Sequence, residues 1–196
     1  MSNKYTISEF ITTGFSYVLT KLFDRKARLI RRPIYIRGKS DLFYKKGFTT
    51  GHGCRFDLKG DNEIRLIFGE NCELGDGVHI VAHEKVVIGN NVLMASKIFI
   101  SDTSHGDYSD EKQDSPLTTP NKRPLITNPV TIGDNVWLGE NVVVLPGVEI
   151  GSGSIVGANS VVNKSIPENS IAVGSPAKVI KTFDFSNNQW KKVEVE

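Results

Sequence analysis

The chain has 196 residues, of which 39% are hydrophobic and 23% charged, and its formal net charge is +2. This length fits one domain, or one domain with an appendage, and the composition excludes a disordered chain and a membrane-embedded bundle. With only two cysteines the chain has no disulfide framework, so we expect a cytoplasmic protein.

The N-terminal segment, residues 1–49, is strongly basic. Residues 1–50 carry 11 Lys/Arg against 3 Asp/Glu, a balance of +8, whereas the other 146 residues carry 13 against 19, a balance of −6. Such an excess suits an anionic surface, either membrane or nucleic acid, or else is a solvated basic arm; we expect no nucleic-acid partner. No apolar run reaches the ~18 residues that span a bilayer, and the start of the chain lacks the features of a signal peptide.

Residues 6–30 are expected to form a helical cap. One helical face collects four apolar residues, Ile11, Phe15, Val18 and Leu22. Basic residues follow closely, namely Lys21, Arg25, Lys26, Arg28, Arg31 and Arg32. Two interpretations stay open: a helix that packs on the fold, and a helix that lies peripherally on an anionic inner membrane.

An aliphatic residue recurs every six positions in the second half of the chain, at Ile132, Leu138, Val144, Ile150, Val156 and Val162. A second series follows four residues later, at Val136, Val142, Val148, Ser154, Ser160 and Ile166. Glycine often follows the first series, and the same spacing appears upstream in two phases, at Phe68, Leu74 and Ile80 and at Ile88, Met94 and Ile100.

A period of six is typical of neither a helix nor a flat strand. It predicts short strands separated by bends, where glycine adopts positive φ without steric cost. Three sides of six residues make a coil of 18, which predicts that Cys54 stacks on Cys72, and Phe56 on Leu74, in neighbouring coils. Both thiols are then expected to be free and buried.

The repeat breaks between Ser101 and Pro129, in a polar segment that contains four prolines. This segment cannot continue the coil, so residues 107–124 are expected to protrude as a loop. Loops of this length inside a compact domain are usually functional or disordered. His105 lies at the base of the loop, five residues after Ile100.

The repeats resemble those of the hexapeptide-repeat transferases. Three runs resemble galactoside and maltose O-acetyltransferases and, more closely, bacterial lipopolysaccharide O-antigen O-acetyltransferases: GNNVLMASKIFISDTSH, ITNPVTIGDNVWLGENVVVLPGVEIGSGSIVGANSVV and SIPENSIAVGSPAKVIK. The resemblance implies an all-β fold, a left-handed parallel β-helix over residues 50–174, an exception to the right-handed crossover rule. The N-terminal helical cap and a C-terminal tail, residues 175–196, would close its two ends.

The resemblance also implies transfer of an acetyl group from acetyl-CoA to a sugar hydroxyl in surface-polysaccharide biosynthesis, with His105 as the general base. Histidine suits this role because its ordinary pKa of ~6.5 lies near operating pH. Asp102, the nearest carboxylate, is a candidate to contact the acceptor or to orient His105; alternatively, it is a solvated loop acid. His79 falls close to an asparagine that holds the acceptor in the related enzymes; alternatively, His79 and His83 are ordinary surface or cleft residues.

The positions that match the acetyl-CoA contacts of the family are Trp137, Gly139, Glu140, Gly157, Ala158, Asn163, Lys164, Lys178 and Lys181. Glu140 replaces a small residue and Asn163 a threonine, and no metal is required. A homotrimer is implied, with each site between two subunits. The open alternatives are N-acylation of an amino sugar and a non-catalytic scaffold; a zinc-dependent carbonic anhydrase is disfavoured because the spacing of His79, His83 and His105 does not match that family.

Overall fold

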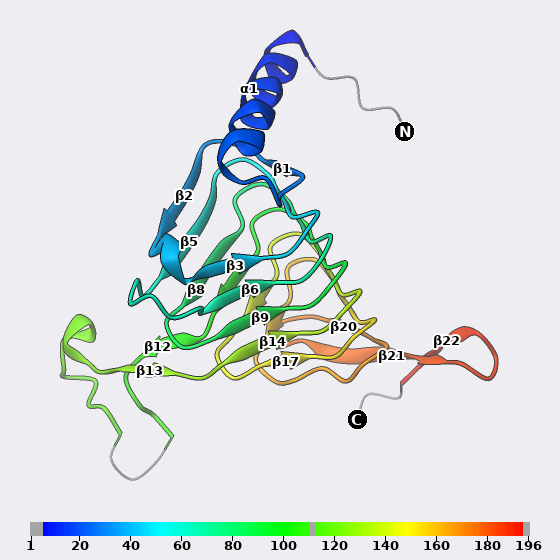
Figure 1. Ribbon diagram of the computed structural model, residues 1–196. Helices are drawn as coiled ribbons and strands as arrows, with labels where there is room; N and C mark the ends of the chain where they lie inside the picture. Colours follow the sequence, from blue (N-terminus) through cyan, green and yellow to red (C-terminus); the bar gives the residue numbers. More distant parts are fainter. Residues whose placement is uncertain (1–5, 110–112, 194–196) are drawn as a thin grey trace.

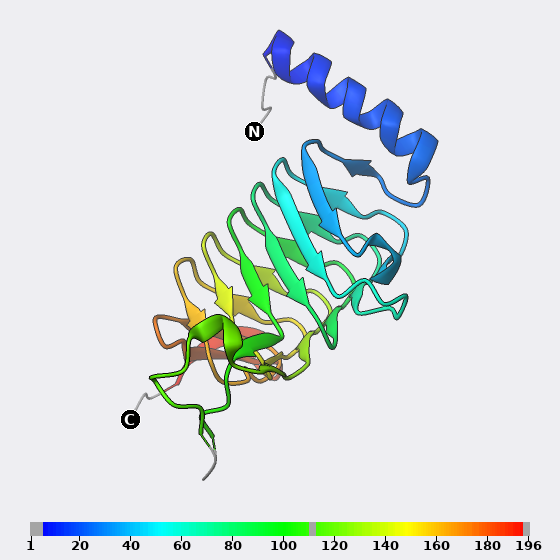
Figure 2. The same cartoon turned by 90° about the vertical axis from the view of Figure 1, so that its left-hand side faces the viewer.

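The computed structural model describes residues 6–109 and 113–193 and shows a three-sided parallel β-helix (Figure 1). Three sheets run along the stack and form the faces of a triangular prism, here called faces A, B and C. The coils stack along one axis, with helix α1 (Ile7–Phe23) across one end (Figure 2).

The faces are built from short strands. Face A contains β1 (Leu29–Ile30), β4 (Thr49–Thr50), β7 (Glu73–Leu74), β10 (Leu93–Met94), β15 (Trp137–Leu138), β18 (Ile155–Val156) and β20 (Ser170–Val173), continued by the antiparallel β21 (Lys178–Asp184) and β22 (Gln189–Lys192). Face B contains β2 (Ile34–Arg37), β5 (Cys54–Leu58), β8 (His79–Ala82), β11 (Phe99–Ser101), β16 (Val143–Val144) and β19 (Val161–Val162). Face C contains β3 (Leu42–Tyr44), β6 (Leu66–Phe68), β9 (Val86–Ile88), β14 (Val130–Ile132) and β17 (Glu149–Ile150).

The remaining elements lie outside the three faces. They are the antiparallel hairpin of β12 (Thr103–His105) and β13 (Leu125–Thr127), and two 3-10 helices, η1 (Lys39–Asp41) and η2 (Pro120–Lys122). No helix among the described residues is both long and apolar enough to cross a bilayer.

The downstream repeat is confirmed. Ile132 pairs with Ile150, Leu138 with Val156 and Val144 with Val162, so each coil in this region has the predicted length. All six side chains are buried. The last coil is shorter, because Ile166 aligns with Ile150 and so belongs to the first apolar series rather than the second.

The predicted stacking of the upstream coils is wrong. Phe56 pairs with Ile80 rather than with Leu74, and Ile80 pairs with Ile100, so both coils are longer than those downstream. Cys54 therefore lies on face B, whereas Cys72 precedes β7 on face A. The extra residues extend the corners between faces, which the apolar spacing does not reveal. Both thiols are free and buried, as expected, and burial raises the pKa of each to about 11.

The glycines after the inward residues serve a different purpose from the one predicted. Gly139 does not adopt positive φ; a Cβ atom there would lie 2.6 Å from the amide nitrogen of Ala158 in the next coil. Glycine is needed because successive coils approach so closely. Asparagines adopt the left-handed conformation at the bends instead, for example Asn135 at φ 57° and Asn141 at φ 57°.

The stack also begins earlier than residue 50. Strands β1, β2 and β3 pair in parallel with β4, β5 and β6, so most of residues 29–49 belong to the solenoid rather than to a cap. These strands lack the glycine-marked hexapeptides of the later coils, so sequence spacing did not reveal them. The helix ends at Phe23, short of the predicted residue 30. The described part of the C-terminal tail continues face A as the antiparallel hairpin of β21 and β22.

Candidate active site

His105 stands on a hairpin that projects from the corner between faces B and C (Figure 1). The chain leaves the coil after Asp102 and returns at Asn128, whose N–H donates to the Asp102 carbonyl over 2.8 Å. Between them β12 and β13 pair antiparallel, with His105 directly opposite Leu125. The predicted protruding loop is thus present and is closed at its base; residues 110–112 lie outside the described residues.

A sharp turn follows His105 immediately. Gly106 has φ +98°, and a Cβ atom there would lie 2.6 Å from the Tyr108 hydroxyl oxygen, so only glycine fits. That hydroxyl donates to the His105 carbonyl over 2.7 Å and accepts from the Arg123 guanidinium over 2.7 Å. These contacts fix the backbone of His105. Its imidazole is exposed and makes no hydrogen bond within the described part of the chain.

Asp102 is wholly buried, so the expectation of a solvated loop acid is wrong. One carboxylate oxygen accepts the His83 N–H at 3.0 Å and the Thr103 hydroxyl at 2.6 Å. The other accepts the amides of Glu84 and Lys85 at 2.7 and 2.9 Å. Asp102 therefore neither meets an acceptor nor orients the imidazole of His105. It fixes the base of the loop to the coil below.

A pocket of about 530 Å³ opens beside the hairpin, lined by Lys59, Arg65, His83, Glu84, Leu125 and Thr127. Side chains directly opposite in a hairpin share a face, and positions two apart share it too. His105 is opposite Leu125, so its imidazole projects on the side of the hairpin that faces this pocket. The sequence analysis did not single out Lys59, Arg65 and Leu125, which line this pocket.

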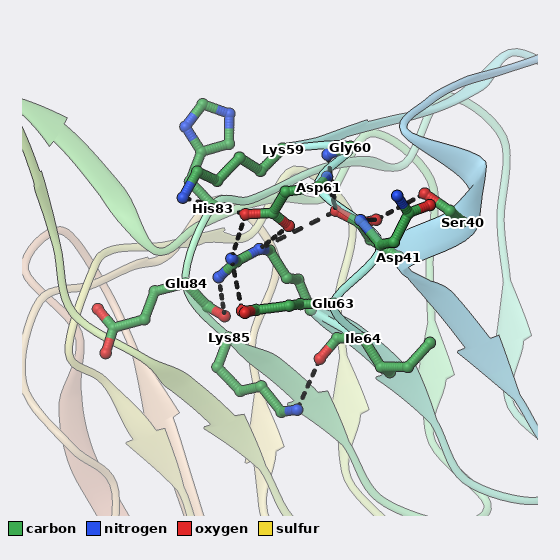
Figure 3. Close-up of polar contacts among 12 residues, drawn as sticks. Ser40, Asp41, Lys59, Gly60, Asp61, Glu63, Ile64, His83, Glu84 and Lys85 are labelled. Carbon is green, nitrogen blue, oxygen red and sulfur yellow. Dashed lines mark hydrogen bonds and ion pairs between the residues drawn. The ribbon is translucent and has the colours of Figure 1, made fainter.

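The floor of this pocket is braced by ion pairs. The Arg65 guanidinium binds the carboxylates of Asp61 and Glu63 at 2.5 and 2.8 Å. The His83 imidazole points away from these carboxylates (Figure 3). The segment that carries Asp61 lengthens the coil between Phe56 and Ile80, and that irregular length is the only sequence signal that marks it.

His79 lies elsewhere, on the outer surface of face B. Its Nε2 contacts a carboxylate oxygen of Asp57 at 2.9 Å, and its ring lies against Phe99 with centroids 5.2 Å apart. Burial of Asp57 opposes ionisation, but hydrogen bonds from Arg55 and His79 outweigh it and hold the pKa of Asp57 below its ordinary value. His79 is thus a half-exposed, paired histidine one coil below β11.

The corner between faces A and B, an edge of the prism, carries several small residues beside Glu140. Gly139, Gly157 and Ala158 occupy it in successive coils. Trp137 stands on face A just before this edge, 49% exposed, and pairs with β10 and β18 on either side. The structure therefore brings these four predicted acetyl-CoA contacts together.

Glu140 links coils along this edge. At this corner a side chain of one coil accepts the backbone N–H of the equivalent residue in the preceding coil. The Ser96 hydroxyl accepts the Asp76 N–H, and the Glu140 carboxylate accepts the Ser96 N–H at 3.1 Å. The next position in this series is Ala158, which has no side-chain acceptor, so the Glu140 N–H finds no partner among the described residues. The Ala158 N–H is likewise unpaired there. Two adjacent coils thus present free amide donors at the same edge.

The predicted basic residues divide between two corners. Lys178 and Lys181 lie on β21. Lys178 pairs with Val173, and Val173 packs beside Gly157: a Cβ atom added to Gly157 would lie 2.7 Å from the Val173 side chain. These lysines therefore lie near the corner between faces A and B. Asn163 and Lys164 instead follow β19, at the corner that also carries His105. A full face, roughly 15 Å wide for about five residues, separates the two corners in a single chain.

No group of three or more His, Cys, Asp or Glu side chains in the described residues could hold a metal ion. The polar groups available at these two corners are the exposed His105 imidazole, the amides of residues 140 and 158 that are unpaired in the described chain, and the lysines named above.

The bacterial transferase hexapeptide family (six repeats) matches residues 129–164. The chain is 43% identical over 193 residues to the putative lipopolysaccharide biosynthesis O-acetyl transferase WbbJ of Escherichia coli K12, covering 98% of this chain and 97% of that protein. It is 37% identical to the galactoside O-acetyltransferase of the same strain, over 62% of this chain and 59% of that protein. Among solved structures, the hexapeptide-repeat acetyltransferase VCA0836 of Vibrio cholerae matches with TM-score 0.57, 26% identity and 74% coverage of both chains.

Proposed function

The chain belongs to the hexapeptide-repeat acetyltransferases, and from that premise we propose that it transfers acetyl from acetyl-CoA to a sugar hydroxyl in surface-polysaccharide biosynthesis. The similarity to WbbJ over almost the whole chain supports the acceptor class. The single observation that carries the chemistry is the exposed His105 imidazole, held on a braced hairpin beside a pocket.

In the proposed reaction the His105 imidazole takes the proton of the acceptor hydroxyl. The hydroxyl oxygen attacks the thioester carbonyl, the C–S bond then breaks, and the coenzyme A thiolate leaves with the proton from the imidazolium. A positioned base of this kind contributes about 10²–10⁴-fold. The pocket lined by His83 and Leu125 would hold the sugar, whereas His79, at the opposite end of β8 and paired with Asp57, would stay outside it.

Acetyl-CoA fits the edge between faces A and B. The unpaired N–H groups of Glu140 and Ala158 would donate to carbonyl oxygens of the pantetheine arm, and the small residues let an extended chain lie close to the backbone. Lys178 and Lys181 would meet phosphates beyond the last coil.

His105 and the amide edge lie at different corners of one prism, so a single copy cannot hold both substrates together. A neighbouring copy packed in parallel would bring its edge to the His105 corner of the first. This supports a closed homotrimer with three sites, each built from two subunits.

His105→Ala tests the base. We expect kcat to fall about 10²–10⁴-fold with an unchanged melting temperature, because the imidazole makes no hydrogen bond in the described chain. The assay is acetyl-CoA turnover with a panel of sugars and lipid-linked oligosaccharides, followed by mass spectrometry that separates an ester from an amide product. A fully active His105→Ala protein would contradict the proposal.

Ala158→Asp tests the cofactor edge. An aspartate there would accept the Glu140 N–H, as Asp134 accepts the Asn90 N–H at another corner over 2.6 Å. We expect the KM for acetyl-CoA to rise about tenfold or more, since one donor is consumed and a negative charge is added. Thr131→Asp, on the exposed surface of face C, is the matched control. Equal KM values for the two variants would refute the placement of the cofactor.

Co-expression of the two variants tests the shared site. In randomly mixed trimers of His105→Ala and Ala158→Asp chains, a quarter of the interfaces combine an intact histidine with an intact edge. At acetyl-CoA well below KM, where the Ala158→Asp protein alone retains about a tenth of the activity, we therefore expect roughly a quarter of the wild-type activity. Activity no higher than the mean of the two separate variants would show that each chain holds a complete site.

A further inference from the structure

Helix α1 packs on the solenoid through small polar residues. Among its residues only Ser16 and Thr20 are buried. The Thr20 hydroxyl oxygen accepts the Ile30 N–H at 2.9 Å, and the Ser16 hydroxyl oxygen accepts the Arg32 N–H at 3.2 Å. The helix is thereby fixed to the first coil by the face that is poorest in hydrocarbon.

The apolar side of α1 points away from the protein. Its side chains are Ile7, Ile11, Phe15, Val18 and Leu22, which are 56–83% exposed. At about 100° per residue these five positions fall within an arc of about 80° centred nearly opposite Ser16 and Thr20. The helix therefore carries a continuous hydrocarbon stripe, which none of the described residues covers. Figure 2 shows the helix itself across the end of the stacked coils.

The charges around the stripe are predominantly positive. The two acids of the helical region are already engaged: Glu9 accepts the Thr6 N–H and hydroxyl, and Asp24 pairs with Lys39 at 3.4 Å. Arg25 and Lys26 are exposed where the helix ends. Lys21 lies against the Tyr17 ring, 5.2 Å from its centroid, at the border of the stripe.

We propose that the stripe of α1 docks on the surface of an anionic lipid bilayer. An exposed hydrocarbon face flanked by cations is the pattern of a helix that lies in the membrane interface, with its apolar side chains at the acyl boundary and its cations at lipid phosphates. Charge favours this occupant over a second copy of the chain packed stripe against stripe. Residues 1–50 carry a balance of +8, so pairing two such segments would bring like charges together.

Membrane docking would set the distance between the bilayer and the acceptor site, an inference that rests on the proposed function. In a parallel trimer all three helices lie at one end and bind one bilayer together. His105 follows β11, three coil steps beyond β2, hence roughly 14 Å along the axis from the first coil. A glycan on a lipid carrier would reach the site through sugars that extend away from the membrane.

Vesicle flotation of the full chain tests the docking. We expect binding to vesicles of phosphatidylglycerol and phosphatidylethanolamine, little binding to phosphatidylcholine, and release by high salt because exposed charges are screened. Phe15→Glu should weaken the partition coefficient at least tenfold, since it puts a charge in the stripe. Thr12→Glu is the matched control: the same charge on an exposed polar position of the same helix.

Equal binding of the Phe15→Glu and Thr12→Glu proteins, or equal binding to neutral and anionic vesicles, would overturn the proposal. So would a change in solution mass of Phe15→Glu without lipid, by light scattering, because a second copy would then cover the stripe. Circular dichroism of both variants is the control that the helix is retained. Acetyl-CoA is absent from these experiments, so failure of docking and failure of the acetyl-transfer proposal are distinguishable.

Discussion

Asp102 should contribute more to stability than any other side chain of the loop base. Its wholly buried carboxylate accepts the N–H groups of residues 83–85 and the Thr103 hydroxyl. Hydrogen bonds to a charged acceptor contribute about 1.5–3 kcal/mol each, and donors left unpaired cost a similar amount. Water reaches part of the vacated space, so we expect Asp102→Ala to lower the free energy of unfolding by about 3–5 kcal/mol.

Asp102→Asn should lower the free energy of unfolding by less, about 2 kcal/mol, because one acceptor oxygen remains while the new amide group faces a backbone donor. The measurement is the urea midpoint by far-ultraviolet circular dichroism, together with kcat for acetyl transfer. Turnover should fall in parallel, because the Asp102 carboxylate fixes the base of the loop that carries His105 to residues 83–85 of the coil below.

The matched control is Asp107→Ala. Asp107 is a carboxylate of the same loop that accepts from the exposed Ser109, and its loss should cost less than about 1 kcal/mol. If Asp102→Ala and Asp107→Ala shift the midpoint equally, the buried carboxylate does not stabilise the loop base and the reasoning fails.

Three further predictions concern other parts of the chain. Burial of Asp41 opposes ionisation, but hydrogen bonds from Ser40 and from the amides of residues 60–62 hold the pKa of Asp41 below its ordinary value. The stability that this carboxylate provides is therefore present above about pH 4 and is lost as the pH falls. Asp41→Asn should flatten the acid side of a curve of unfolding free energy against pH. The thiols of Cys54 and Cys72, with pKa values of about 11, should not react with Ellman's reagent at pH 8 until the chain unfolds, whereas rapid native-state labelling would contradict their burial. Gly106→Ala should lower turnover at least tenfold through displacement of His105, with a smaller loss for Ala substitution at exposed Gly53.

The sequence by itself determined the regular part of the fold. Between Ile132 and Val162 the apolar pulse every six residues predicts the inward side chain of each face, because each strand is too short to bury more than one or two residues. The position of His105 at the start of the interruption also followed from the sequence, since a proline-rich polar segment cannot continue a coil.

Only the tertiary structure decided the rest. The upstream coils are longer than the downstream ones because their corners carry extra residues, and corner length changes no apolar spacing within a strand. The same holds for Asp102: its carboxylate is buried by amides from the coil below, which no local pattern reveals. The outward stripe of α1 was visible in the sequence, but which side faces the solenoid depended on two small hydroxyls that find their partners in the first coil. The apolar period predicts which residue each strand buries, whereas the contacts between coils depend on the number of residues at each corner.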